Sequence, residues 1–566
     1  MTCALVRVKM VILIGFLCLT VHTTTARGQT LDQAADDIEW LRSSLNDLAV
    51  LPGQPATVSA GGLTQTQTPL LTIENHTPFS ASTRQRIVIV AGLDGKRESA
   101  RLAIAAVRWF KSEANEEIRR AWDISVMPLA NPPGHPTDTF PPTEFFFNDS
   151  ERPDTRYIWR WVAYQAPDLV VELTTGDTFQ IAGTGQEGTL SAALSGHSTN
   201  NKLGGVPVVV VAAPTQDAER VMREILTRAP ESRSDLRTTV DNRVRRRPLE
   251  IARLLAERYP GTPSMNYISG VAWVHTLRLA ALLNDSSLRA KVIRDVQPWL
   301  SGEESITGDR ITFAGLAGTM VFGELAKTRS PHRVTAEQLA TEGVALAAKE
   351  SESGLPDYGS GWSDDVFLGT IAANTAQNRT GMEAAVRLII RYANELQQPS
   401  GLWHHAPDAP VTWGRGNGFA ARGLAETLSS LPRDHNAFST VLDIYRRHME
   451  GMRSHQAPDG MWRQVVDLPG SYRETSVTAL TLTAMSRGVR LGWLDQSYQT
   501  VVEHAWRGLL AHIETDGTLV DVCISTGAGP TLRHYLDRTA VQGADDRGGA
   551  LALGAALEME ALLDSR

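Results

Sequence analysis

The spacing of apolar positions along this chain changes near residue 232. From residue 87 to 214, short β-branched runs such as RIVIVAGLDG and GVPVVVVAAP alternate with stretches of helical period. In one such stretch, Leu102, Ala106 and Phe110 fall on the same helical face. Strands that alternate with helices predict an α/β sheet, so we expect an α/β domain over residues 29–231.

From residue 249 to the end, strand patterns disappear and helical stretches recur, broken by Gly, Pro, Asn and Asp. In TGMEAAVRLIIRYANELQ, Met382, Val386 and Ile389 share one stripe, which is typical of an amphipathic helix. Roughly ten to twelve helices fit this region, at about 25 residues for each helix and loop. The spacing predicts an all-α domain of helical hairpins over residues 249–566, either an open solenoid or a closed toroid.

The two regions are joined by a polar and basic segment, SRSDLRTTVDNRVRRRP, at residues 232–248. Runs of charge are usually solvated, so we expect an interdomain linker here.

The N-terminus has the pattern of a secretory signal peptide. Arg7 and Lys9 precede an apolar stretch at residues 10–21, and small and polar residues follow. We expect residues 1–28 to be removed and the mature chain to be secreted or periplasmic, with an uncleaved membrane anchor as the alternative. This is the only long apolar run, so no interior segment is expected to span a membrane.

Charge and cysteine content narrow the choice of partners. The 566 residues include 55 Lys and Arg against 63 Asp and Glu, a net charge of −8. No basic surplus is present to neutralise phosphates, which argues against nucleic-acid binding. Of the 3 cysteines, only Cys523 lies outside the expected signal peptide, so the mature chain has no internal disulfide.

Residues 87–214 resemble the zinc metallocarboxypeptidases in AGLDGKRESA, PLANPPG and VVELTTGD. That family binds zinc with a His-x-x-Glu pair and a second His after a later strand. Here Asp94, Arg97 and Thr174 stand at those positions. A catalytic zinc needs three protein ligands, so the resemblance implies a degenerate domain without metal. We expect a scaffold or a glycan-contacting domain, with a residual peptidase as the alternative.

Two stretches of the C-terminal region are rich in side chains that can bind a ligand or take part in catalysis. GWSDDVFLG holds Trp362 and Asp364, and its aspartates can equally be read as the N-cap and first turn of a helix. GLWHHAPDAPVTWGRGNGF places two Trp, two His, Arg415 and Asn417 in one glycine-rich loop. Aromatic faces stack on sugar rings and Arg pairs with carboxylates, so this loop is a candidate site for an acidic sugar.

Two later stretches add further candidates. GMWRQVVDLPGSYRETS contributes Tyr472, Arg473 and Glu474. DGTLVDVCISTG, HYLDR and DDRGGA follow, and these three could be loop anchors.

Taken together, the C-terminal motifs resemble the unsaturated glucuronyl and rhamnogalacturonyl hydrolases, in the family's order and over nearly all of residues 249–566. The resemblance implies an (α/α)6 toroid with the site at one mouth. The matching motifs are WSDDVF at 362–367, GLWHH at 401–405, WGRGNGF at 413–419, SYRETS at 471–476 and DDRG at 545–548.

The resemblance also implies an unusual reaction. The substrate is a polysaccharide-lyase product whose terminal uronic acid carries a C4=C5 double bond. A carboxylic acid protonates C4, water adds at C5, and the hemiketal collapses to release the remaining sugar. This is not the two-carboxylate displacement at the anomeric carbon. The acid must hold a proton and then act as a base, which partial burial beside Trp or another carboxylate favours.

Residue by residue, Asp364 matches the family's catalytic Asp, and Asp365 is interpreted as a first-turn charge. Arg415 or Arg473 is expected to bind the substrate carboxylate. No cofactor and no metal are implied. The expected substrate-binding residues are Trp362, His405, Trp413, Arg415, Asn417, Tyr472 and Arg473.

One departure from the family is serious. A second Asp usually faces the catalytic one from an earlier helix, but TFAGLAGTMVFGELA at residues 312–326 contains none. Asp309 lies just before this stretch and is the candidate replacement.

Three other functions stay open. The loss of the second Asp and of the zinc ligands motivates a non-catalytic carbohydrate-binding or scaffold protein. A polysaccharide lyase or an ordinary glycosidase would use the same toroid, and a working peptidase would need bound zinc. The sequence does not identify the uronide that is cleaved, the role of the N-terminal domain or the oligomeric state.

Overall fold

The computed structural model describes residues 36–52, 55–75, 78–80, 82–132, 153–183, 190, 202–351, 354 and 356–565. The expected signal peptide lies outside these residues. The described residues fall into two compact units. The first unit draws on the chain up to Asn75, Thr83–Gly196 and Val206–Ser234, and the second on His76–Ser82, His197–Gly205 and Asp235–Arg566.

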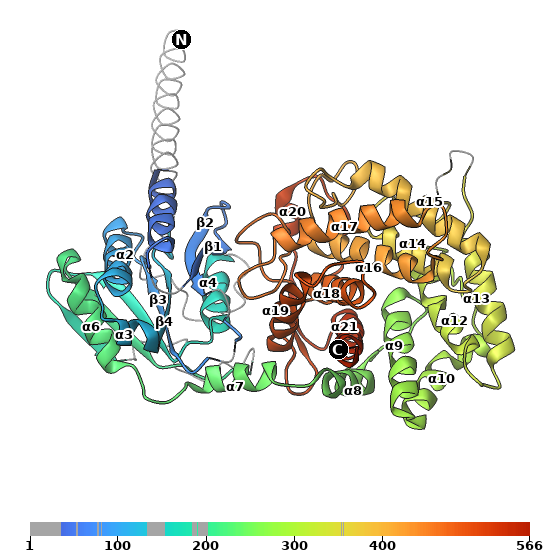
Figure 1. Cartoon of the computed structure of the whole chain (residues 1–566), viewed down its shortest axis with the longest axis horizontal. Helices are drawn as coiled ribbons and strands as arrows, with labels where there is room; N and C mark the ends of the chain where they lie inside the picture. The colour runs from blue at the N-terminus through green and yellow to red at the C-terminus, as the bar shows by residue number, and fades with distance from the viewer. Residues whose placement is uncertain are drawn as a thin grey trace, which may run out of the picture. The chain divides into compact units, whose positions relative to one another are not determined.

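The first unit contains a seven-stranded mixed sheet in the order β1-β2-β4-β3-β5-β7-β6 (Figure 1). The central strands β4, β3, β5 and β7 are parallel, while the pairs β1–β2, β2–β4 and β6–β7 are antiparallel. The strands are β1 (Ala56–Leu63), β2 (Pro69–Asn75), β3 (Gln85–Ala91), β4 (Trp122–Met127), β5 (Leu169–Thr175), β6 (Gln180–Gly183) and β7 (Val208–Ala213).

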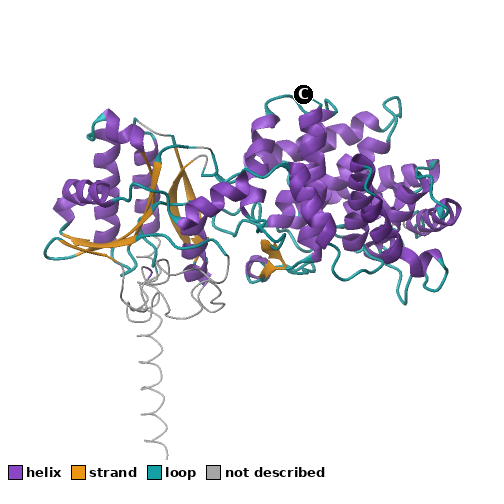
Figure 2. Ribbon diagram, turned by 90° about the horizontal axis from the view of Figure 1, so that it is seen from below, coloured by secondary structure: helices purple, strands orange, loops and turns teal. Residues whose placement is uncertain are grey.

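Both faces of this sheet are covered, which explains why its central strands are almost continuously apolar. Ile87 and Ile89 of β3 join a core with helices α2 and α6, and the intervening Val88 and Val90 are buried as well. Figure 2 shows helices on either side of the strands. The predicted α/β unit is therefore confirmed. Its helices include α2 (Arg97–Ser112), α3 (Glu116–Ala121), α4 (Pro153–Tyr164) and α6 (Ala218–Arg228).

The positions compared with zinc ligands form a small hydrogen-bonded cluster. The Oδ2 of Asp94 accepts hydrogen bonds from the hydroxyls of Ser99 and Thr174, each at 3.0 Å. The Nη1 of Arg97 donates a hydrogen bond to the Oδ1 of Asp37 at 2.9 Å. Within the described part of the chain, no group of three His, Cys, Asp or Glu is placed to hold a metal ion. The carboxylate of Asp94 thus ties the start of α2 to the end of β5.

The second unit is built mainly from helices, as predicted. Among the described residues, twelve helices of at least seven residues follow α7, within the expected ten to twelve. The longer helices are α7 (Asp235–Val244), α8 (Pro248–Arg258), α9 (Tyr267–Leu283), α10 (Ser286–Leu300), α12 (Met320–Ala326), α13 (Arg333–Ala347), α14 (Asp365–Asn374), α15 (Arg379–Leu396), α16 (Gly414–Ser430), α17 (Phe438–Ser454), α18 (Thr475–Arg490), α19 (Tyr498–Ala511) and α21 (Asp546–Asp564), and the short ones α11 (Phe313–Leu316) and α20 (Leu532–Leu536).

Six of these helices pack in a closed order. Helix α14 packs on α16, α16 on α18, α18 on α21 and α21 on α9, which packs on α12. The turn before α12 reaches α14 and completes the circuit. Helices α8, α10, α13, α15, α17 and α19 each pack against a member of this circuit. Small residues permit the close approach: a Cβ at Gly423 would lie only 1.9 Å from the carbonyl oxygen of Val366.

The segment expected to be a solvated linker, 232–248, is largely helical. Helix α7 buries Leu236, Arg237 and Val240, and its residues belong to the second unit. Arg243 donates to the carbonyl of Ala511 at 3.0 Å, and Arg246 donates to those of Leu510, Ile513 and Glu514. The last carbonyls of a helix need partners and favour cations. The arginine run therefore caps the end of α19, and the expectation of a free linker is corrected.

A second difference concerns the end of the chain, where no strand was expected. Leu519–Cys523 forms β8, which pairs antiparallel with β9 (Ala540–Gly543). Burial of all five β8 residues explains why the run LVDVC becomes a strand. In the described part of the chain, no helix has the length and apolar character needed to cross a membrane.

Candidate active site

The C-terminal motifs meet where the helices of the circuit begin. Asp364 precedes α14, Trp413 precedes α16, and Glu474 caps α18 by accepting from the backbone amides of its first turn. Asn266 caps α9 and Asp545 caps α21 in the same way. Helix N-termini carry partial positive charge, so this end of the unit favours an anionic ligand.

Asp364 is held by a histidine from another loop. The Nε2 of His405 lies 3.1 Å from the Oδ2 of Asp364, and the Nδ1 of His405 lies 2.7 Å from the hydroxyl of Tyr535. The His405 side chain is fully buried, whereas 14% of the Asp364 side chain is exposed. Of the residues that the structure describes, none hydrogen-bonds the Oδ1 of Asp364. One oxygen is therefore fixed and the other is available to a ligand.

The partners of Tyr535 indicate how the protons are arranged. The Tyr535 oxygen accepts the backbone N–H of Gly529 at 3.1 Å, and its own hydroxyl proton can go to Nδ1 of His405. A neutral imidazole carries one N–H, and the partner of one nitrogen decides which nitrogen holds it. The ring proton then lies on Nε2 and is donated to Asp364.

Two tryptophans flank this pair. The ring of Trp413 is buried with its centroid 4.4 Å from that of His405. Trp362 is partly exposed, and its ring meets the His405 ring edge-on at 5.5 Å. A buried aromatic face and an exposed one beside a carboxyl are suited to a sugar ring. The structure thus brings together Trp362, Asp364, His405 and Trp413, as the motifs predicted.

Asp365 has more contacts than a first-turn charge. Its carboxylate accepts hydrogen bonds from the backbone amides of Ser360 and Gly361 at 2.7 and 2.9 Å, and from the hydroxyl of Tyr392 at 2.6 Å. Burial raises the pKa of Asp365, the Tyr392 hydrogen bond lowers it and the neighbouring Asp364 raises it, and the pKa that results is about 6. Asp365 therefore anchors the loop that carries Trp362 and Asp364.

Arg415 lies beside the site but is already engaged. It is 2% exposed, its guanidinium covers the Trp413 ring at 4.7 Å, and its Nη1 and Nη2 donate to the carbonyls of Cys523 and Ile524 at 2.6 and 2.8 Å. A bidentate carboxylate contact needs two donors on one side of the fork. In this structure, Nη1 and Nη2 of Arg415 instead bind backbone carbonyls at the end of β8 and so join α16 to that strand.

Three other residues expected to bind the substrate make contacts within the protein. Asn417 is fully buried and bonds the backbone of Trp403 and Trp413, which pins the loop between them. Tyr472 is buried, and burial raises its pKa well above 10. Arg473 donates from Nε to the buried Asp459 at 2.8 Å. These contacts support the loops around the site.

Asp309 is the candidate for the second carboxylate that the family resemblance implies. This residue lies in an exposed turn between α10 and α11. No contact in the described part of the chain joins it to Asp364. Helices α11 and α12, where the second Asp was sought, contain only uncharged residues apart from Glu324 near the far end of α12.

Sequence reasoning missed three residues of this region: Tyr535, Tyr267 and Arg547. Tyr535 lies in HYLDR, which was expected only to anchor a loop, and Arg547 lies within the matched motif DDRG without having been given a role. Tyr267, Tyr535 and Arg547 belong to α9, α20 and α21, and tertiary packing brings them together without a local signal in the sequence.

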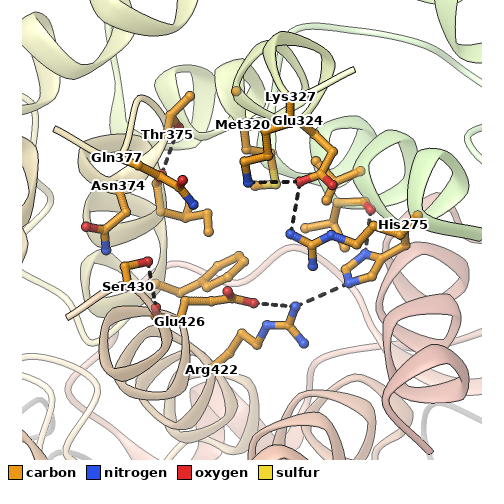
Figure 3. A pocket seen from close by; sticks show the side chains of 16 residues that line it. His275, Met320, Glu324, Lys327, Asn374, Thr375, Gln377, Arg422, Glu426 and Ser430 are labelled. Atoms are coloured by element: carbon orange, nitrogen blue, oxygen red, sulfur yellow. Dashed lines mark hydrogen bonds and ion pairs between the residues drawn. The ribbon is translucent and has the colours of Figure 1, made fainter. Parts of the chain in front are cut away.

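A polar cavity of about 70 Å³ lies toward the other ends of the same helices (Figure 3). Its ion pairs include Arg278 with Glu324 at 3.1 Å, and Glu426 with Arg487 at 2.9 Å. Helix C-termini carry partial negative charge and favour cations, which accounts for this arginine-rich lining. The titratable residues that line the cavity are His275, Arg278, Glu324, Lys327, Arg422 and Glu426.

Two known proteins share part of the sequence of this chain. The chain is 32% identical over 111 residues to an unsaturated 3S-rhamnoglycuronyl hydrolase of Alteromonas sp. (strain LOR), a match that covers 19% of this chain and 27% of that protein. It is 23% identical over 233 residues to the unsaturated rhamnogalacturonyl hydrolase YesR of Bacillus subtilis (strain 168), covering 36% of this chain and 66% of that protein. The chain thus spans less than two thirds of the length of either relative.

Solved structures were compared as well. A possible member of the GH105 family from Salmonella enterica serovar Paratyphi A aligns with a TM-score of 0.49 and 18% identity. The alignment covers 60% of this chain and 97% of that one. None of the comparisons described here supports the carboxypeptidase-like assignment of the first unit.

The model of Glycosyl Hydrolase Family 88 matches residues 260–563. This range is more than half of the chain and contains every motif gathered at the helix N-termini. The chain therefore belongs to Glycosyl Hydrolase Family 88.

Proposed function

We propose that this protein hydrolyses unsaturated uronyl oligosaccharides, such as lyase-generated rhamnogalacturonan fragments, by hydrating the C4=C5 double bond of the terminal ring. The carrying observation is the partly exposed Asp364 carboxyl, which is held through Oδ2 by His405, a residue whose ring contacts Trp362 and Trp413. Membership of the family and the printed names of the relatives support the same substrate class.

In the first step, a protonated Asp364 gives its proton to C4 of the substrate. The positive charge that develops at C5 is shared with the ring oxygen. His405 would keep the carboxyl oriented by its N–H to Oδ2, so that Oδ1 faces the substrate. A positioned acid of this kind typically contributes 10²–10⁴-fold to the rate, roughly.

In the second step, water adds to C5 and its proton returns to the Asp364 carboxylate, which restores the acid. The C5 hemiketal then opens by breaking the bond between C5 and the ring oxygen. This leaves a ketone at C5 and a hemiacetal at C1, and the hemiacetal releases the remaining sugar as an alcohol. One carboxyl can therefore serve both steps, and this order of steps does not need an Asp in α11 or α12, which contain none.

We also propose that the closed helix circuit is an (α/α)6 toroid, with the site at the mouth formed by the helix N-termini. The packing order that returns from α21 to α9 supports this architecture. Trp362 would stack on a sugar ring at the mouth, while Asn417, Tyr472 and Arg473 would act on the substrate only through the loops they hold.

The remaining expectations are proposals about the cellular setting. The N-terminal pattern of residues 1–28 supports secretion or a periplasmic location. The first unit would be a degenerate carboxypeptidase-like scaffold, supported by the sequence resemblance alone. An acidic oligosaccharide is the expected partner.

The test uses purified protein and lyase-generated oligosaccharides of rhamnogalacturonan, glycosaminoglycan and ulvan. Loss of enol-ether ultraviolet absorbance with one of them would establish hydration and identify the sugar. Binding without any loss of absorbance would instead favour the non-catalytic carbohydrate-binding protein. Formation of the absorbance from intact polysaccharide would indicate a lyase.

A further inference from the structure

A uronyl substrate carries a carboxylate, and the arginines first considered for it are committed elsewhere. Both terminal nitrogens of Arg415 donate hydrogen bonds to backbone carbonyls. Arg473 is paired with Asp459, which is itself buried. An anion on a protein of net charge −8 needs a local cation, so another group must be found.

Arg547 is placed for this role in the first turn of α21. Its Nε donates to the hydroxyl of Tyr267 at 3.0 Å, and its Nη1 lies 3.3 Å from the carbonyl oxygen of Cys523. Of the described residues, none accepts a hydrogen bond from its Nη2. The side chain is 13% exposed, and its nearest carboxylate oxygen, on Asp545, is 4.0 Å away. The guanidinium is thus oriented but only weakly neutralised.

Arg547 lies at the same end of the helices as Asp364. It shares the Cys523 carbonyl with Arg415, whose guanidinium covers Trp413. Trp413 in turn contacts His405, the partner of Asp364.

A second path through ring contacts leads to the same place. The ring of Tyr267 meets Phe419 edge-on at 5.6 Å, and Phe419 stacks on Phe367 at 5.6 Å. Phe367 follows Asp364 in the first turn of α14 and donates its amide to the Asp364 carbonyl at 3.1 Å. Two series of contacts therefore connect Arg547 and Tyr267 to the residues around Asp364.

We propose that Arg547, oriented by Tyr267, binds the carboxylate of the unsaturated uronyl ring. This inference rests on the proposed function and assigns the carboxylate contact to α21 instead of α16. The N-terminus of α21 adds a second favourable charge at the same place. Because the carboxylate is attached to C5, holding it there would fix the double bond relative to Asp364.

The experiment compares an unsaturated uronyl disaccharide with its methyl ester, which lacks the negative charge. Initial rates of absorbance loss would be measured for the wild type, Arg547→Gln, Arg547→Lys, Tyr267→Phe and Arg415→Lys. Arg379→Gln serves as the control, because Arg379 is an exposed residue of α15. Thermal unfolding of each variant checks that it folds.

Arg547→Gln is expected to raise KM for the acid about 10- to 100-fold and to leave KM for the ester nearly unchanged. Arg547→Lys and Tyr267→Phe should raise KM for the acid less, in the same direction. An unchanged preference of Arg547→Gln for the acid over the ester would overturn the inference, as would loss of that preference only in Arg415→Lys. A wild type that consumes neither substrate would instead contradict the proposed function.

Discussion

The Nε2 of His405 lies 3.1 Å from the Oδ2 of Asp364, although 41 residues separate them along the chain. The loop of His405 and the start of α14 are also joined by the backbone, since the amide of Ser363 donates to the His405 carbonyl at 2.8 Å. The orientation of the Asp364 carboxyl therefore depends on a contact between two loops. Several consequences can be measured.

Tyr535→Phe removes the hydroxyl that fixes His405 and keeps the aromatic ring. We expect kcat to fall about tenfold with little change in KM, because the lost hydrogen bond, worth about 1 kcal/mol, orients the histidine and not the substrate. Steady-state kinetics on the preferred oligosaccharide checks this. An unchanged kcat would show that Tyr535 has no part in positioning His405.

Asp365→Asn should change the pH dependence of stability. The pKa of Asp365 is raised from 3.8 to about 6, so the folded chain binds this proton more tightly than the unfolded chain. Its contribution is fully present below pH 3.8 and is lost as the pH rises to about 6, by about 3 kcal/mol.

Urea unfolding of the wild type and of Asp365→Asn between pH 4 and 7 measures this contribution. The stability of the wild type relative to the variant is expected to decrease as the pH rises through this window. Parallel curves for the two proteins would mean that Asp365 does not titrate there.

Arg246→Ala tests the helix cap that replaces the expected linker. Arg246 donates to the carbonyls of Leu510 and Glu514, each at 3.0 Å, at the end of α19. Leaving these carbonyls unpaired should lower the free energy of unfolding by about 1–3 kcal/mol. Arg245→Ala, at an exposed neighbouring position, is the control and should have almost no effect. Equal melting temperatures for the two variants would argue for a loosely attached segment.

Glu426→Gln tests whether the polar cavity that Glu426 lines takes part in substrate binding. Glu426 pairs with the buried Arg422 and Arg487, which would be left without full compensation. The free energy of unfolding should fall by about 3–5 kcal/mol, while KM stays unchanged. Denaturant unfolding and steady-state kinetics check the two parts. A large rise in KM with normal stability would place the substrate at the wrong end of the helices.

Local sequence patterns were sufficient to predict some features of the fold and of the site, but not others. Alternation of apolar runs predicted the α/β unit, and helical stripes predicted the helices, because each pattern reports the face that its element buries. The motif order also predicted that Trp362, Asp364, His405 and Trp413 belong to one site.

The errors have a common physical cause. Arg243 and Arg246 were interpreted as solvated charges, but their partners are backbone carbonyls about 268 residues away, which no local pattern reveals. The same is true of Tyr535, which reaches His405 across 130 residues. Polar groups whose partners are distant backbone or side-chain atoms leave no period in the sequence.

The most direct test of the central claim is to run the reaction in D2O and to examine the product by NMR, with Asp364→Asn alongside the wild type. Protonation by Asp364 predicts that the wild type consumes the enol ether and places one deuterium at C4, and that Asp364→Asn does neither. Release of the sugar with the double bond intact and no deuterium at C4 would contradict the account.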